Sequence, residues 1–255
     1  MSRVAVLTVT MDRYDLTVRC LGPSLHKAGC PFKFYSWDNG SIDRRTPDYV
    51  ATLGPVYQGL SIENIGYAPA INQLLLRCTD YDYYDAIYDY FCVIDPDMEM
   101  PPDWLKILVE YNEAIPESGW SGYHCVLNKA PETELHGKRV HCQGIYGVKC
   151  FNRRVFDRLG YFQDDFGVYG NEDCEMNRRL ALAGFQSYYV GNGMSCIHAG
   201  DDCGDKSPYR KMKWDALEHA SVVLERHYAE LAAGASLYKH PPKLIYPELY
   251  SGNAA

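Results

Sequence analysis

The sequence lacks the features of a membrane-spanning or exported protein. No stretch approaches the ~20 consecutive apolar residues that a membrane-spanning helix needs. The N-terminal stretch "MSRVAVLTVTMDR" reaches Asp12 and Arg13 before it is long enough to serve as a secretory signal. We therefore expect a cytoplasmic protein without a membrane span.

Cysteine pairs of the Cys-x-x-Cys type are also absent, although the chain has ten cysteines spread from Cys20 to Cys203. In a protein without an export signal, such cysteines are expected to be reduced thiols rather than disulfides. We predict that most of them are buried. A zinc site built from some of them is the alternative.

An excess of basic residues is the third absence, because the formal net charge is −8. A general nucleic-acid binder would show a basic balance or a basic face, so that class is disfavoured. A local basic cluster stands out against this background, at Lys206, Arg210, Lys211 and Lys213. The simplest interpretation of that cluster is a solvated start of a helix.

What the chain does contain is enough apolar material for one large core, with 47% hydrophobic residues in 255. β-rich runs alternate with helical patterns, which predicts an α/β fold with a mostly parallel sheet. No repeat or low-complexity linker divides the chain, so we expect a single domain over residues 1–255. The expected strands are 3–10, 32–38 and a run ending at Asp95, and the expected helices are 14–29, 69–77, one from 102, 172–184 and 210–234.

Three details of these helices can be predicted. Gly22-Pro23 should kink or split the first helix, because proline removes a backbone donor. Asn171 is placed to cap the helix at 172, and Gly184 is placed to end it. The stretch from Trp120 to Gly147 shows no regular pattern.

Acidic residues follow two of the expected strands. Asp38 ends one strand, and the run "YFCVIDPDMEM" ends another at Asp95-Pro96-Asp97. In parallel sheets ligands bind beyond the carboxyl ends of the strands, so Asp38 and Asp95 should converge on one rim. Two carboxylates one residue apart suit Mg²⁺ or Mn²⁺, although a solvated turn has the same appearance.

Six stretches together indicate a family. In order they are "VTMDRYDLTVRCLGPSL", "FYSWDNGSIDR", "GYAPAINQLL", "FCVIDPDMEMPPDWL", "GVYGNEDCEMNRRLALAGF" and "CIHAG". Over Val4 to His198 their order and spacing resemble the family 2 glycosyltransferases of the GT-A type. The resemblance implies a Rossmann-like three-layer sandwich. It also implies a nucleotide-sugar binding half (1–98), an acceptor and catalytic half (99–200), and a C-terminal loop and helix (201–255).

The resemblance implies roles for several residues near the donor. Thr8 and Arg13 fall where the first loop borders the nucleotide, and Asp38 matches the carboxylate that accepts a hydrogen bond from the base, most often uracil. Asn72 matches a residue near the donor, and Asp95 would face the ribose and the metal. The expected donor is therefore a UDP-sugar. The sequence differs from the family at Asp12, where asparagine is common, and at the Gly22-Pro23 break.

The resemblance also implies a metal site. Asp97 would bind Mn²⁺ or Mg²⁺ directly, and His198 is the expected third ligand beside Asp95. Lys206, Arg210 and Lys211 follow closely, where a loop could fold over the diphosphate.

A catalytic pair is implied at Glu172-Asp173. We expect Asp173 to deprotonate the acceptor hydroxyl and Glu172 to orient the substrate, with inversion at the sugar carbon. Acidic residues in a first helical turn also stabilise the helix dipole, which is the structural alternative for this pair.

The acceptor stays open. Aromatic side chains that could stack on a sugar are Trp120, Tyr123, His124 and Tyr146, although aromatic residues are more often core. The resemblance allows a glycan or another hydroxyl acceptor, including a hydroxymethylated base in DNA. Basic pairs that could follow a phosphate backbone are Lys138-Arg139 and Arg153-Arg154.

Three other functions compete with this hypothesis. A phosphohydrolase of the haloacid dehalogenase type also has a strand ending in Asp-x-Asp, with Asp95 then acting as nucleophile. A sugar-nucleotidyltransferase is disfavoured, because "TVTMDRYD" contains no glycine. A non-catalytic module that binds nucleotide sugars or glycans is the non-enzyme alternative.

Overall fold

The structure is a computed structural model that describes residues 2–79, 87–124, 131–142, 147–202 and 208–242. One nine-stranded sheet contains strands from both halves of the chain. Its strands are β1 (Val4–Thr10), β2 (Lys33–Asn39), β3 (Tyr57–Ser61), β4 (Tyr90–Val93), β6 (Ser118–Gly122), β7 (Glu132–Leu135), β8 (Lys138–His141), β9 (Lys149–Asn152) and β10 (Gln186–Val190). A separate ladder joins β5 (Met98–Glu99) to β11 (Ile197–His198).

The strand order is β3-β2-β1-β4-β9-β6-β10-β8-β7. The first four of these strands are parallel to one another. β9 is antiparallel to both of its neighbours, β4 and β6, so β6 runs in the direction of β4, and β10 is parallel to β6. The predicted mostly parallel sheet is therefore confirmed, with β9 and β8 as its reversed strands.

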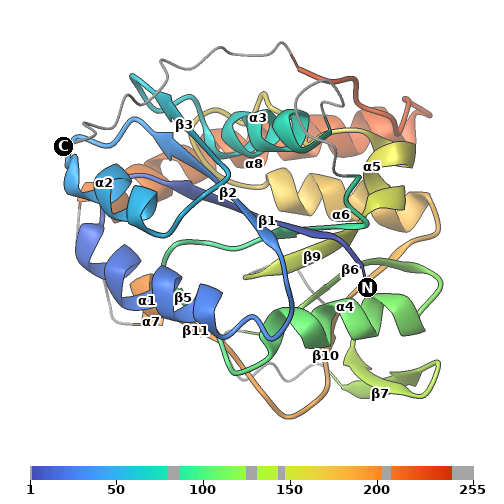
Figure 1. Cartoon of the computed structure of the whole chain (residues 1–255). Helices are drawn as coiled ribbons and strands as arrows, with labels where there is room; N and C mark the ends of the chain where they lie inside the picture. Colours follow the sequence, from blue (N-terminus) through green and yellow to red (C-terminus); the bar gives the residue numbers. More distant parts are fainter. Residues whose placement is uncertain (1, 80–86, 125–130, 143–146, 203–207, 243–255) are drawn as a thin grey trace.

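Helices cover both faces of the sheet. They are α1 (Tyr14–His26), α2 (Arg45–Thr52), α3 (Tyr67–Thr79), α4 (Trp104–Ala114), α5 (Arg153–Leu159), α6 (Glu172–Leu182), α7 (Ala199–Asp202) and α8 (Pro208–Ala232). Figure 1 shows α3, α6 and α8 on one side of the strands and α1 and α4 on the other.

Side chains of β1 show how the layers form. Val4 and Val6 belong to the core cluster under α1 and α4, and Ala5 and Leu7 belong to the cluster under α3 and α6. This division follows from the two-residue repeat of a strand, and both faces are apolar because both are covered. The predicted three-layer, Rossmann-like α/β fold is confirmed.

The predicted split of the first helix was wrong, because α1 continues through Gly22 and Pro23. Pro23 lies near the end of α1, so it removes one backbone donor while the buried side chains of Leu21 and Leu25 keep the helix on the sheet. Gly22 has its own packing reason. A Cβ atom at this position would collide with the Tyr49 hydroxyl of α2.

The expected helix 172–184 is observed as α6, but its predicted cap differs. Asn171 stands at the N-cap position in a left-handed conformation and makes no side-chain cap. Its amide instead donates to the Ser221 hydroxyl of α8 at 3.4 Å. Gly184 follows the helix with φ +81°, as expected for a terminating glycine.

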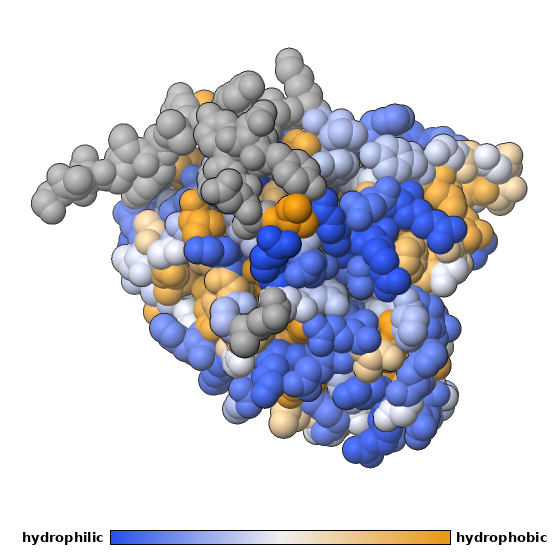
Figure 2. All heavy atoms as spheres, turned by 45° about the vertical axis from the view of Figure 1, so that its right-hand side comes forward, coloured by the Kyte–Doolittle hydropathy of each residue, from blue (hydrophilic) through white to orange (hydrophobic). Residues whose placement is uncertain are grey.

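The described helices were considered as candidates for a membrane span. Each helix in the described ranges is too short or too polar to cross a bilayer. On the face drawn in Figure 2, hydrophobic residues form small groups within a largely hydrophilic surface.

Candidate active site

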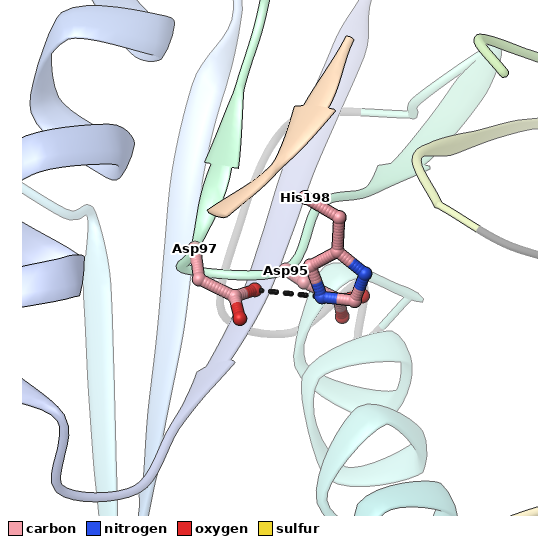
Figure 3. Close-up of side chains that lie close together, drawn as sticks. All are labelled: Asp95, Asp97 and His198. Carbon is pink, nitrogen blue, oxygen red and sulfur yellow. Dashed lines mark ion pairs between the residues drawn. The ribbon is translucent and has the colours of Figure 1, made fainter. Parts of the chain in front are cut away.

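Three potential metal ligands meet at the carboxyl end of β4. Asp95 and Asp97 follow this strand, and the chain then continues into β5. β5 pairs with β11 so that His198 lies opposite Met98, the neighbour of Asp97. A two-residue ladder thus brings together segments that are far apart in the sequence (Figure 3).

The three ligand groups are close enough to share one ion. One ligand atom from each of Asp95, Asp97 and His198 lies within 4.8 Å of the others. Asp97 is 3% exposed, and its Oδ1 atom lies 3.2 Å from His198 Nε2. Its Oδ2 atom lies 2.9 Å from Arg13 Nη1.

The surroundings of Asp97 favour its ionised form. Burial acts to raise its pKa, but the hydrogen bond and charge of His198 and the charges of Arg13 and Lys213 together lower the pKa below its ordinary value. Arg13 reaches the carboxylate from the loop before α1, where its own φ of 58° is left-handed.

This donor set fits a small divalent cation. Carboxylate and imidazole ligands suit Mn²⁺, and Mg²⁺ also accepts carboxylates. The Asp97 Oδ2 atom is buried and, within the described ranges, accepts no hydrogen bond of good geometry. Gly200 keeps space beside it, because a Cβ there would collide with Arg13 and Asp97.

Asp95 is oriented by a tyrosine that the sequence analysis did not single out. The Tyr67 hydroxyl, at the start of α3, donates to Asp95 Oδ1 at 2.9 Å. Burial and the adjacent Asp95 charge raise the pKa of Tyr67 well above its ordinary value, so it stays a donor. Hydrogen bonds of this kind fix the orientation of metal-binding carboxylates. The signal was present in "GYAPAINQLL", but the tyrosine resembled a core aromatic residue.

The expected catalytic pair lies at the start of α6, beside a lysine that the sequence analysis missed. Lys149 Nζ on β9 lies 3.4 Å from Asp173 Oδ2. Glu172 is 7% exposed and accepts a hydrogen bond from the Gly170 amide at 3.1 Å. Burial and the charge of Asp173 raise the pKa of Glu172 to about 7. The sequence signal for Lys149 was a single charge in the otherwise apolar run "GVKCF".

A small pocket lies between this pair and Tyr67, the residue that orients Asp95. It has a volume of about 20 Å³, and its polar lining residues include Tyr67, Lys149, Glu172 and Asp173. Tyr67 also contacts Asp95, so the two groups of carboxylates share one wall.

Asp38 lies near the end of β2 and is 1% exposed. Its carboxylate accepts hydrogen bonds from the Ser41 amide at 3.0 Å, the Ser41 hydroxyl at 2.6 Å and the Thr10 hydroxyl at 3.2 Å. Burial raises the pKa of Asp38 above its ordinary value despite these bonds. The structure therefore gives Asp38 a role in holding the "DNGS" turn, and base recognition stays a prediction.

Thr8 and Asn72 lie in the core. The Thr8 hydroxyl donates to the Ile94 carbonyl at 2.8 Å, which holds β1 against the end of β4. Asn72 uses both ends of its amide on the Phe162 backbone, at 2.9 and 3.0 Å. Both side chains are completely buried and have structural partners.

The basic cluster before and within α8 is described in part. Lys206 and the side chain of Arg210 lie outside the described residues. Lys211 is exposed and pairs with Asp215 at 2.5 Å. Lys213 lies 4.4 Å from the centre of the Tyr169 ring and contributes to the low pKa of Asp97. Of these four residues, Lys213 is the one that acts on the Asp95–Asp97–His198 cluster, through its charge.

The aromatic residues proposed for stacking divide between core and rim. Trp120 and Tyr123 are fully buried, so for these two the alternative of a core position holds. Apolar packing explains this, because Trp120 fills the space between Phe151 and Tyr189. His124 is half-buried and contacts Tyr189 edge-on, whereas Tyr146 lies outside the described residues.

The basic pairs have partners within the chain. Lys138 lies over the Tyr111 ring, and Arg139 faces Glu132 at 3.7 Å. Arg153 faces Asp157 at 3.5 Å, and Arg154 donates to the Pro116 carbonyl at 2.8 Å. These contacts give no support to a track for a phosphate backbone.

The described cysteines are free thiols. Five of them are buried and Cys142 is exposed, in agreement with the expectation of reduced, mostly buried residues. Within the described residues, the one cluster of three potential metal ligands is Asp95, Asp97 and His198, which contains no cysteine.

Comparison with known proteins identifies the fold. No protein-family model and no curated sequence matches the chain. The structure is similar to a mannosyltransferase from Pyrobaculum calidifontis in complex with GDP-mannose and Mn²⁺, with a TM-score of 0.61, 21% identity, and coverage of 94% of this chain and 66% of that one. It is similar to residues 1–349 of TarS from S. aureus, with a TM-score of 0.55, 15% identity, and coverage of 78% and 61%.

A third similar structure is GalNAc-T7 with UDP, GalNAc and Mn²⁺, with a TM-score of 0.53, 11% identity, and coverage of 74% of this chain and 42% of that one. This chain therefore spans 66% of the length of the mannosyltransferase, 61% of the TarS fragment and 42% of the GalNAc-T7 chain. At these identities the likeness concerns the fold, and that fold is the one used by nucleotide-sugar glycosyltransferases of the GT-A type.

Proposed function

We propose that this protein is a metal-dependent glycosyltransferase that moves a sugar from a nucleoside-diphosphate sugar to an acceptor hydroxyl. The observation that carries the proposal is the convergence of Asp95, Asp97 and His198 at the carboxyl end of the sheet in a GT-A fold. The similar mannosyltransferase structure contains GDP-mannose and Mn²⁺, and the GalNAc-T7 structure contains UDP and Mn²⁺.

Asp97, Asp95 and His198 would hold the divalent cation. When bound, such an ion supplies positive charge that stabilises a leaving diphosphate. Arg13 adds a cation 2.9 Å from Asp97, and Lys213 adds a second cation from α8. These two side chains favour binding of the negatively charged donor.

Asp173 is proposed as the base that takes the proton of the acceptor hydroxyl. It lies at the start of α6 with a side chain that is 20% exposed, so an acceptor can reach it. Glu172 is more deeply buried and accepts a backbone hydrogen bond, which suits a role in orienting the substrate. Direct displacement with this base on the acceptor side would invert the sugar carbon.

The donor base is proposed to be uracil, with Asp38 as its partner. Asp38 already uses both carboxylate oxygens on Ser41 and Thr10. A carboxylate oxygen can accept more than one hydrogen bond, so a base could share Asp38 with these residues.

The experiment that tests this function is a metal-dependent transfer assay. The protein is incubated with UDP-, GDP- and dTDP-sugars and Mn²⁺, and release of nucleoside diphosphate is measured with wild type, with chelator, and with Asp97→Asn. We expect slow hydrolysis of at least one donor by wild type alone. Absence of hydrolysis and of metal-dependent nucleotide binding would contradict the proposal, and a phosphoaspartate trapped on Asp95 would favour a phosphohydrolase instead.

The acceptor is proposed to be a carbohydrate or another hydroxyl compound. Beside Asp173, the side chain of Lys149 is 14% exposed and offers a polar group that a hydroxyl compound could contact. A panel of sugar acceptors added to the same assay should increase donor consumption above the rate of hydrolysis.

A further inference from the structure

Lys149 occupies an unusual position for a lysine. It begins β9, where its backbone lies between Val93 of β4 and Gly122 of β6. Its side chain is 14% exposed and reaches the rim at which β4 ends. Lysine is rarely buried without partners, because removing an ammonium group from water is costly. The partners of Lys149 therefore indicate why it is there.

Those partners are the candidate base and a backbone carbonyl just before β9. Lys149 Nζ lies 3.4 Å from Asp173 Oδ2 and donates to the Gly147 carbonyl at 3.4 Å. Burial opposes its charge, but the carboxylates of Asp173, Asp95 and Glu172 act more strongly and raise the pKa of Lys149 above its ordinary value. The ammonium group therefore stays charged beside the candidate base, in a pocket whose lining residue Tyr67 donates to the candidate metal ligand Asp95.

We propose that Lys149 is a positioning residue that holds Asp173 toward the acceptor and, through its charge in the pocket that it shares with Tyr67, the partner of Asp95, weakens divalent-cation binding at the Asp95–Asp97–His198 cluster. The inference deepens the proposed function and rests on it. The first part follows from the ion pair, because a carboxylate held on one oxygen keeps the other oriented. The second part follows from Coulomb repulsion between the ammonium group and a cation bound nearby.

A purely structural role for Lys149 predicts different behaviour. The adjoining pocket of about 20 Å³ has room for roughly one water molecule, so an unbranched apolar side chain could replace the lysine stem without overpacking. Lys149→Met keeps this stem and removes the charge. Lys149→Arg keeps the charge, and Lys149→Gln is a smaller polar replacement. Lys106→Met is the matched control, because Lys106 is 55% exposed on α4 and pairs with Glu110.

The test measures metal affinity and turnover separately. Titration of the purified protein with MnCl₂, without nucleotide, should give about threefold to tenfold tighter binding for Lys149→Met than for wild type. Sugar transfer by the same variant should fall by about 10-fold to 100-fold in kcat, with the donor KM changed by less than about threefold. Lys149→Arg should return both quantities toward the wild-type values, and the Lys106 control should change neither.

Several results would overturn the inference. Unchanged or weaker Mn²⁺ binding in both Lys149→Met and Lys149→Gln would remove the electrostatic role, and an unchanged kcat would remove the positioning role. Weaker Mn²⁺ binding and a lower kcat, together with a lower melting temperature, in all three Lys149 variants including Lys149→Arg would show that Lys149 has a structural role. Failure of the proposed function can be told apart from failure of this inference. In the first case the wild-type protein would bind Mn²⁺ but transfer no sugar, and the Mn²⁺ titrations would still measure the effect of the Lys149 charge.

Discussion

Arg13 Nη1 lies 2.9 Å from Asp97 Oδ2, so the guanidinium group occupies one side of the carboxylate on which the metal site depends. His198 occupies the other side at 3.2 Å. A cation bound at this cluster would therefore share Asp97 with an arginine that is itself suited to binding phosphate. Metal and diphosphate are expected to bind more strongly together than separately.

Asp97→Asn tests this dependence. Loss of the charge should weaken UDP binding in Mn²⁺ by about tenfold or more, while binding in chelator should change little. Calorimetric titration with UDP under both conditions measures the effect. Equal affinity of the wild-type protein for UDP with and without Mn²⁺ would count against any role of the cluster in metal binding.

Asp38→Asn should change donor binding more than chemistry. The amide keeps the shape of the side chain but presents a donor where Ser41 and a base both donate, so KM for the UDP-sugar should rise more than kcat falls. Steady-state kinetics at saturating Mn²⁺ gives both values. Ser41→Ala is the control, since it disturbs the same turn and leaves the carboxylate.

Asp38→Ala should in addition lower stability by roughly 1–3 kcal/mol, because the buried donors of Thr10 and Ser41 lose their acceptor. Urea denaturation measures this cost. An unchanged KM in Asp38→Asn would show that the residue serves the fold alone.

Asp173→Asn should separate catalysis from binding. If Asp173 takes the acceptor proton, transfer should fall by roughly 10²–10⁴-fold while metal-dependent UDP binding is retained. If the residue only stabilises α6, the variant should lose a fraction of a kcal/mol in unfolding and keep its turnover. UDP affinity, melting temperature and kcat are measured on the same preparation. A near-normal kcat would show that Asp173 is not the base and would make Glu172 the next candidate.

Glu172 predicts a pH dependence of stability. Its pKa is raised to about 7, so the folded protein binds a proton between about pH 4.5 and 7 that the unfolded chain releases. Stability should therefore decrease as the pH rises through this range. Glu172→Gln should remove at least about 1 kcal/mol of that decrease, measured by urea denaturation from pH 5 to 8. Glu134→Gln, at an exposed position of β7, should leave the slope unchanged.

The elements that sequence predicted well are those with a strong repeat. β1 and β2 are apolar runs of seven residues each, and α3 and α6 have helical spacing between recognisable ends. The break expected at Pro23 did not occur, because local propensity there is overridden by packing against the sheet.

The metal cluster was predicted residue by residue, through the family resemblance, but the element that assembles it was not. β5 and β11 have two residues each, which is too short for any repeat to indicate a strand. Tyr67 and Lys149 were missed for a related reason. Each is a single polar group within an apolar segment. Its role is indicated by its partner in the structure, which is Asp95 for Tyr67 and Asp173 for Lys149.

The ladder between β5 and β11 has a consequence for biosynthesis. His198 enters the cluster by pairing with Met98, so a growing chain that has not yet emerged beyond β11 lacks one ligand even if β1 to β4 have already assembled. Ion binding with all three ligands would therefore require a chain that has emerged past β11. Mn²⁺ affinity measured on chains of increasing length would report when folding of the catalytic region is complete.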